Sequence, residues 1–183
     1  TVFERGNKRG LNYGTTDGTN SVARKAILAA LNACAAATTV APRPAQAQTI
    51  TRHIKVIYAQ ATLRYAKLVG DDIADASAYE EHQAEGMAFF NVIYPWASVS
   101  TADIEVLGNF FDVEAAPDSF NDFAYCKTKK AMETFLGADA SLMGTLDAAD
   151  EDGTTCADTL PSGATGVVTD VGTYYPAGGE DIG

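Results

Sequence analysis

The chain has 183 residues, of which 46% are hydrophobic and 20% charged, and its formal net charge is −11 at pH 7. This size and composition are typical of one globular domain and argue against a disordered chain. No apolar run is long enough for a transmembrane segment, and the acidic balance argues against nucleic-acid binding, which requires clustered Lys and Arg.

The charge is distributed unevenly along the chain. Residues 1–130 hold all 13 basic and 14 acidic residues, whereas residues 131–183 hold 10 acidic residues and no basic one. Gly, Pro, Thr and Asp dominate residues 147–183, so we expect a helical body at residues 1–146 and an irregular acidic tail or linker after it. The tail is either a solvated segment or a surface that attracts cations. The chain begins with Thr rather than Met, which suggests a processed secreted chain or a fragment of a longer one.

The first half of the chain contains two strong helix signals. Residues 1–20 hold four glycines and are expected to be irregular. An Ala- and Leu-rich helix is predicted at residues 22–37, followed by an extended connector at residues 38–49, because prolines do not continue a helix. Apolar residues at spacings of three and four predict a helix at residues 50–69, ended by Gly70.

The second half of the body continues the helical pattern. A helix is predicted at residues 78–94, stopped by Pro95, and a capped helix follows at residues 101–111. A further helix is expected at residues 120–136, ended by Gly137, with one or two turns at residues 139–146. The predicted fold class is therefore mainly α, a compact domain of about four to five helices with a long irregular acidic C-terminal tail.

Two side chains in the segment YEEHQAEG suggest a metal site. His82 and Glu85 are three residues apart, so on a helix they project from one face. An imidazole and a carboxylate that converge on one face suit a metal ion. The alternative is a solvated first helical turn whose acidic residues are favoured by the helix dipole.

Two tyrosines on the helix 50–69 suggest a second part of that site. Tyr58 and Tyr65 are seven residues apart on one stripe, and Arg64 adjoins Tyr65. A phenolate is an anionic oxygen donor that suits the hard cation Fe(III), and an arginine can hold a small anion with two hydrogen bonds. The alternative is two core tyrosines whose hydroxyls are satisfied locally.

The third candidate site is a cationic segment that precedes the first predicted helix. Arg5, Lys8 and Arg9 lie within five residues in a glycine-rich stretch, which is either an anion clamp or a loop with solvated charges. No common catalytic signature is present, so we do not expect an enzyme.

The three cysteines lack C-x-x-C spacing, which disfavours a thiolate zinc site. We predict a disulfide between Cys126 and Cys156, which would hold down the tail, and a buried free thiol at Cys34. The competing pairing is Cys34 with Cys126, and spacing alone does not decide between them.

Several segments together resemble a known family. FERGNKRGLNYG, HIKVIYAQATLRYAK and YEEHQAEGMAFFNVIYPW, followed by NFFDV and FAYCKTKKAMETFLGADASLMGTL, are similar to one repeat of the low-iron-inducible periplasmic proteins of algae. That family includes the iron-assimilation proteins of green algae and the phytotransferrins of diatoms. The resemblance covers roughly residues 3–146.

The resemblance implies an extracellular, periplasmic or cell-surface protein that takes part in iron acquisition. Phytotransferrin-type members bind Fe(III) with carbonate as a synergistic anion, and members often carry two repeats where this chain has one. The expected function is therefore Fe(III) binding with a synergistic anion. The residue patterns above, rather than the resemblance, suggest its ligands, which are Tyr58, Tyr65, His82 and Glu85, with the anion on Arg64. A protein partner or second repeat could contact the acidic tail. The rival is a non-catalytic structural or adaptor subunit of a larger extracellular or photosynthetic assembly, and an enzyme of inorganic carbon chemistry is a third reading.

Overall fold

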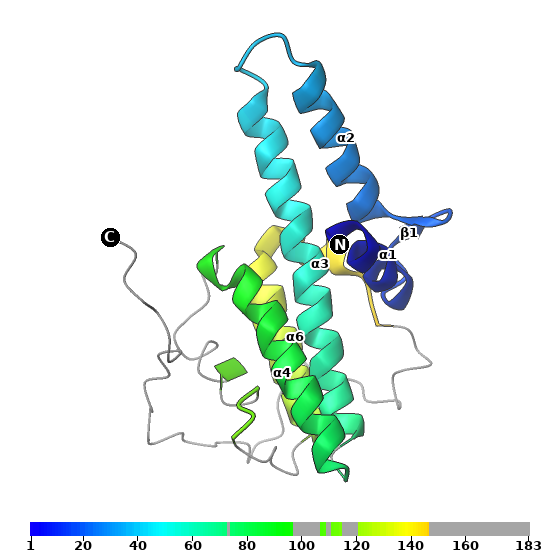
Figure 1. Ribbon diagram of the computed structural model, residues 1–183, viewed down its shortest axis with the longest axis vertical. Coiled ribbons are helices and arrows are strands. Elements are labelled where there is room, and N and C mark those ends of the chain that lie inside the picture. The colour runs from blue at the N-terminus through cyan, green and yellow to red at the C-terminus, as the bar shows by residue number, and fades with distance from the viewer. Residues whose placement is uncertain (73, 97–106, 109–110, 115–120, 147–183) are drawn as a thin grey trace.

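The computed structural model describes residues 1–72, 74–96, 107–108, 111–114 and 121–146. Five α-helices lie in this part of the chain (Figure 1). The predicted mainly α fold class is confirmed. The predicted tail at residues 147–183 and most of the helix predicted at residues 101–111 lie outside the described residues.

A single long helix organises the fold. This helix, α3, runs from Arg43 to Asp71, and each of the other four α-helices packs against it. In chain order the elements are α1 (Val2–Asn12), β1 (Thr16–Asp17), β2 (Asn20–Ser21), α2 (Val22–Ala36), α3, α4 (Ala76–Ile93), the 3-10 helix η1 (Tyr94–Trp96), α6 (Asn121–Leu136) and the 3-10 helix η2 (Gly137–Met143). The two short strands pair antiparallel.

The prediction of irregular structure at residues 1–20 is wrong for α1. Thr1 and Glu4 form a reciprocal capping box that starts this helix. Gly6 and Gly10 lie inside it, where a Cβ on Gly10 would come within 2.4 Å of the Ser21 Cβ. These glycines thus serve close packing between segments rather than a loop.

The predicted extended connector at residues 38–49 is wrong from Arg43 onward. Helix α3 already begins there, with Pro44 in its first turn. Proline is tolerated at that place because the first amide groups of a helix have no intrahelical acceptor. The helix predicted at residues 50–69 is confirmed as the larger part of α3. The helices predicted at residues 22–37, 78–94 and 120–136 correspond to α2, α4 and α6.

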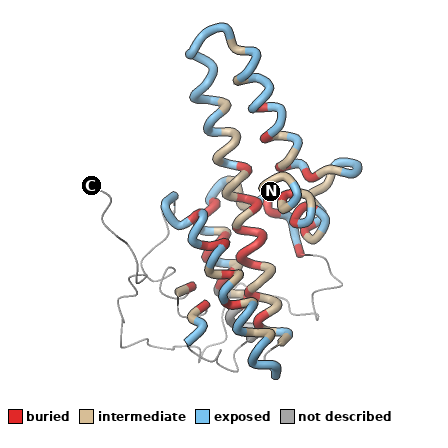
Figure 2. Tube along the Cα trace, viewed as in Figure 1, coloured by how far each residue is buried: buried red, intermediate tan, exposed pale blue. Residues whose placement is uncertain are grey.

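The main core lies where the lower part of α3 meets α4 and α6 (Figure 2). Phe111 belongs to it and is 1% exposed. Its ring lies against Gly86 of α4, where an added Cβ would come within 2.1 Å of the Phe111 Cε1 atom. The other end of the molecule is different, because no residue from 31 to 50, in the upper hairpin of α2 and α3, is buried. The predicted site residues lie on α3 and α4 at the packed end of the molecule.

A buried polar contact joins α3 to the two ends of the body. The Gln60 side chain donates a 2.7 Å hydrogen bond to the Met143 carbonyl oxygen, and the Tyr13 hydroxyl donates one of 2.8 Å to the Gln60 carbonyl oxygen. Buried polar groups are costly unless paired. These bonds hold the segment after α1 and the end of η2 against α3.

His53, a buried side chain of α3, gives the fold a pH dependence that can be measured. Burial and then the neighbouring charge of Arg52 lower the pKa of His53 from 6.5, while Asp139 opposes the shift. The unfolded chain therefore takes up a proton that the folded protein resists. The free energy of unfolding should fall as the pH drops through 6.5 toward the lowered pKa, by at most about 1.4 kcal/mol per pH unit.

Replacing His53 with glutamine should remove this part of the acid destabilisation. The check is urea unfolding of both proteins at several pH values from neutral to mildly acidic. The difference in unfolding free energy between wild type and His53→Gln should shift in favour of the variant as the pH falls. Parallel pH profiles would contradict the assignment.

Candidate functional site

Three predicted ligand residues come together between α3 and α4. The Tyr65 hydroxyl of α3 is hydrogen-bonded to the Glu85 carboxylate of α4. The His82 ring, one turn before Glu85, lies 5.8 Å from the Tyr65 ring between centroids. All three side chains are partly exposed to solvent. The spacing of His82 and Glu85 thus places both on the face of α4 that is turned toward α3.

A carboxylate at the end of α3 lies beside the imidazole of His82. The His82 Nδ1 atom is 3.2 Å from an oxygen of Asp72, although the pair lacks hydrogen-bond geometry. Metal-binding histidines commonly have a carboxylate near the ring nitrogen that does not bind the metal, since it orients the ring. Asp72 therefore suits the role of orienting His82, with Nε2 available to a ligand.

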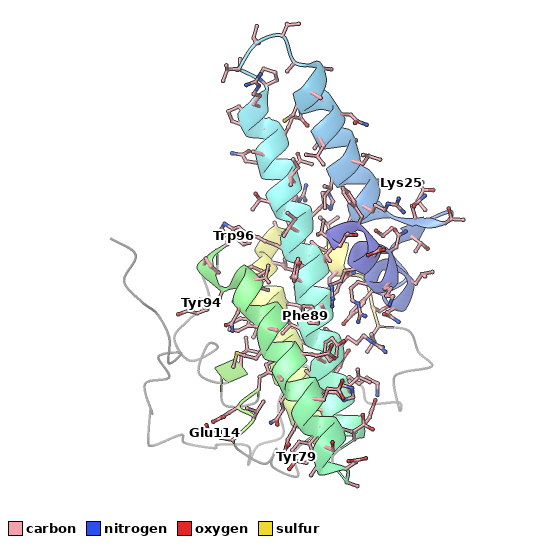
Figure 3. The ribbon with its side chains drawn as sticks, viewed as in Figure 1. Lys25, Tyr79, Phe89, Tyr94, Trp96 and Glu114 are labelled. Carbon is pink, nitrogen blue, oxygen red and sulfur yellow. The ribbon has the colours of Figure 1, made fainter. Side chains whose placement is uncertain are left out.

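Tyr58 lies next to this group rather than within it. Its ring is 6.1 Å from the Phe89 ring, and the Tyr65 ring is 5.2 Å from that same ring. Figure 3 marks Phe89 on α4, beside α3. Seven residues of helix separate the two tyrosines by about 10 Å along α3. The aromatic ring of Phe89 thus connects them, and the structure brings Tyr65, His82 and Glu85 closer to one another than to Tyr58.

Three arginines surround the Tyr65 side of the site. Arg5 and Arg9 come from α1 and Arg64 comes from α3. The Arg5 guanidinium carbon lies 4.1 Å from the centre of the Phe89 ring, and the charges of Arg64 and Arg5 both act on Arg9. Helix α1 packs against α3, as Figure 1 shows, and its residues five and nine are one turn apart. The capping that makes residues 2–12 helical therefore creates this cationic cluster.

Arg9 is buried, with 7% of its surface exposed. Its Nε and Nη1 atoms are buried and make no hydrogen bond in the described part of the chain. Burial, and after it the charge of Arg64, lower the pKa of Arg9. A buried guanidinium with two nitrogen atoms that donate no hydrogen bond is costly, since its lost hydration is not replaced.

The charges around Tyr65 oppose one another. Burial, the hydrogen bond to Glu85 and the Glu85 charge raise the pKa of Tyr65, and the positive charges of Arg9 and Arg5 act in the opposite direction. The net effect is a raised pKa, so the hydroxyl stays protonated near neutral pH. The site therefore stores one proton between a phenol oxygen and a carboxylate oxygen.

The oxygen and nitrogen donors define what the site can do chemically. Among the described residues, no three His, Cys, Asp or Glu side chains lie close enough together to hold a metal ion. A metal at this place would thus need the Tyr65 oxygen in addition to Glu85 and His82. Oxygen donors of this kind favour hard cations.

Sequence reasoning identified Arg64 but missed the contribution of α1. The signal was present, because Arg5 and Arg9 stood out as clustered cations, yet the surrounding glycines suggested a loop. Arg9 was not singled out from Lys8, which is exposed. The spacing of four residues between Arg5 and Arg9 places both on one face once the segment is helical.

The cysteines divide as follows. Cys34 is a free thiol, partly exposed rather than buried as predicted, and Cys126 is disulfide-bonded. The predicted partner, Cys156, lies outside the described residues, so the Cys126–Cys156 pairing stays a prediction. The competing pairing of Cys34 with Cys126 does not occur in the structure.

Comparison of the chain with protein-family models, with curated proteins and with solved structures gives no match in any of the three. Within the described residues, no helix combines the length and the apolar character needed to cross a membrane.

Proposed function

We propose that this protein binds ferric iron together with a small synergistic anion such as carbonate, outside the cytoplasm, as part of iron acquisition. The observation that carries the proposal is the hydrogen bond between Tyr65 and Glu85, flanked by His82 on one side and by the arginine cluster on the other. The resemblance of residues 3–146 to the algal low-iron-inducible family supports the same function.

The Tyr65–Glu85 hydrogen bond holds a proton at the place that the metal would take. Ferric iron would replace this proton and be bound by the phenolate and the carboxylate. Because Fe(III) is a hard cation of high charge, it compensates for the cost of deprotonating a tyrosine whose pKa is raised. His82 would supply a nitrogen ligand with its ring oriented by Asp72.

The arginines provide the charge that an anion ligand needs. Carbonate bound to Arg64, Arg9 or Arg5 would lie next to Tyr65 and could complete the coordination of iron. Tyr58 would contribute only if the Phe89 ring, which lies beside both tyrosines, moves. We therefore place Tyr65, Glu85 and His82 in the first group of ligands and Tyr58 in a second group.

The iron-binding proposal is tested by the colour of the complex. Ferric nitrilotriacetate is added to the full chain in bicarbonate buffer, and we expect a visible tyrosinate-to-iron charge-transfer band. Tyr65→Phe should abolish the band, since it removes the phenolate oxygen and keeps the ring that contacts His82 and Phe89. Tyr94→Phe is the matched control, because Tyr94 is 48% exposed at the opposite end of α4 (Figure 3), and it should retain the band.

The outcome also assigns Tyr58. A band that weakens in Tyr58→Phe and disappears in Tyr65→Phe would make both tyrosines ligands. A wild-type protein that stays colourless with iron and bicarbonate, or a band of full strength in Tyr65→Phe, would overturn the proposed site.

A second candidate function, a non-catalytic adaptor subunit, is favoured by the upper hairpin. On this hairpin, apolar side chains are exposed at Leu28 (47%), Leu31 (43%) and Val40 (68%). Exposed apolar surface of this kind is typical of contacts with other proteins. An adaptor would give no coloured iron complex, so the same experiment separates the two candidates.

A further inference from the structure

Arg9 is the strongest unexplained feature of the site, because it is a buried cation without sufficient partners. It is 7% exposed, and its Nε and Nη1 atoms make no hydrogen bond to any residue that the structure describes. The buried side chain of Gln60, by comparison, donates a hydrogen bond to the Met143 carbonyl oxygen. Buried charges are normally paired because their lost hydration has to be replaced.

Two neighbouring arginines add positive charge next to Arg9. Arg64 and Arg5 both disfavour its charged form. Like charges near a buried guanidinium add to the cost of its charge, and an anion bound beside it would lower that cost. The Glu85 carboxylate on the other side of Tyr65 is engaged by the Tyr65 hydroxyl.

We propose that Arg9, flanked by Arg5 and Arg64, binds a small divalent oxoanion in the metal-free protein. The inference rests on the proposed function for the biological role of the site. It deepens that function because the anion would bind before the metal does. Arg9 on α1 is the anchor, and Arg64, the residue that the sequence indicated, is a flanking group.

The chemistry of the guanidinium group defines the ligand class. Its planar fork presents parallel N–H donors that match two oxygens of a carbonate, phosphate or sulfate. The positive charges of Arg9 and Arg5 favour an anion with at least two charges. Because Arg9 is 7% exposed, only a small anion reaches it, and chloride lacks the paired oxygens for bidentate binding.

The test uses the metal-free full chain. Thermal unfolding is followed in sodium chloride and, at equal ionic strength, in bicarbonate, in phosphate and in sulfate. We expect at least one oxoanion to raise the unfolding temperature relative to chloride, since a ligand that binds the folded state stabilises it. The oxoanion that raises the unfolding temperature most is the one that the site binds best among bicarbonate, phosphate and sulfate.

Arg9→Met provides the decisive comparison, because it keeps much of the side-chain length and removes the charge. In chloride this variant should unfold at a higher temperature than wild type, and it should lose the additional stabilisation by the oxoanion. Lys8→Met is the matched control, since it removes one exposed positive charge from the neighbouring position, and it should keep the oxoanion effect.

Arg9→Lys covers the case in which Arg9→Met does not fold. It retains the charge and loses the fork, so titration calorimetry with the effective oxoanion should show binding at least tenfold weaker than in wild type. Equal oxoanion shifts in wild type and Arg9→Met, equal affinities in wild type and Arg9→Lys, or no oxoanion effect in wild type would overturn the inference.

The two proposals fail separately. An oxoanion effect that depends on Arg9, in a protein that forms no coloured iron complex, would support this anion site and reject the proposed iron function. A coloured complex that forms equally well without any oxoanion, in a protein without an oxoanion effect, would support iron binding at Tyr65 and reject both this anion site and the synergistic anion.

Discussion

Replacing Gly86 with alanine is expected to destabilise the protein by about 2–3 kcal/mol, although the same change usually stabilises the interior of a helix by about 1 kcal/mol. The reason is the contact with Phe111, since the added Cβ would lie 2.1 Å from the Phe111 Cε1 atom. The Phe111 ring is 1% exposed and is part of the main core, so it has little freedom to move away. Urea unfolding at neutral pH measures the difference.

Ala88→Gly is the matched control for the effect of helix propensity. Ala88 lies two residues further along α4 and is exposed, so the variant should lose only about 1 kcal/mol. Combining Gly86→Ala with Phe111→Leu should cost less than the sum of the two single changes, because the smaller side chain leaves room for the new methyl group. A Gly86→Ala protein as stable as wild type would show that Phe111 does not pack closely on α4.

Ferric affinity is expected to fall by about tenfold for each unit of acidification below neutral pH, because the metal has to displace the Tyr65 proton. Burial and the bond to Glu85 raise the pKa of Tyr65, so the phenol is protonated throughout this range. Each bound ferric ion thus releases at least this one proton, and acid favours release.

Competition with nitrilotriacetate at fixed free Fe(III) measures this dependence from pH 7.5 to pH 5.5, with affinity decreasing by about a factor of 100 in total. Asp72→Asn is an informative variant, since it keeps the shape of the side chain next to His82 and removes its charge. It should weaken binding by about tenfold and leave the Tyr65 contribution to the slope intact. An affinity that does not change with pH would exclude both Tyr65 and His82 as ligands.

Local sequence signals predicted most of the helices. Helices α2, α4 and α6 follow apolar spacing and recognisable ends, such as Pro95 after α4 and Gly137 after α6. Helix α1 escaped prediction because Gly6 and Gly10 favour turns in isolation, and only contacts with Ile57 and Ser21 reveal why glycine is needed there. The start of α3 escaped prediction because proline ends a helix but is also accepted in its first turn.

The site could be predicted only within single helices. The spacing of His82 and Glu85 placed both on one face of α4, and Tyr65 was recognised on its own stripe. Their convergence depends on how α4 packs against α3, which no local pattern encodes. The burial of Arg9 depends on α1 lying against α3, so the sequence showed a cationic cluster without showing which of its members lacks a partner.

The division of α3 into a packed half and an exposed half has a consequence for its dynamics. Residues 31–50 of the upper hairpin contain no buried residue, so their helical structure has less support from side-chain packing than the lower part of α3 has. Helical segments of this kind open locally at small free-energy cost, whereas a core segment opens only with the whole domain. Amide hydrogens of the upper hairpin should therefore exchange with solvent long before those around Tyr65. The helix that carries the site is thus protected at one end, and the other end can unwind without disturbing the geometry of the ligands.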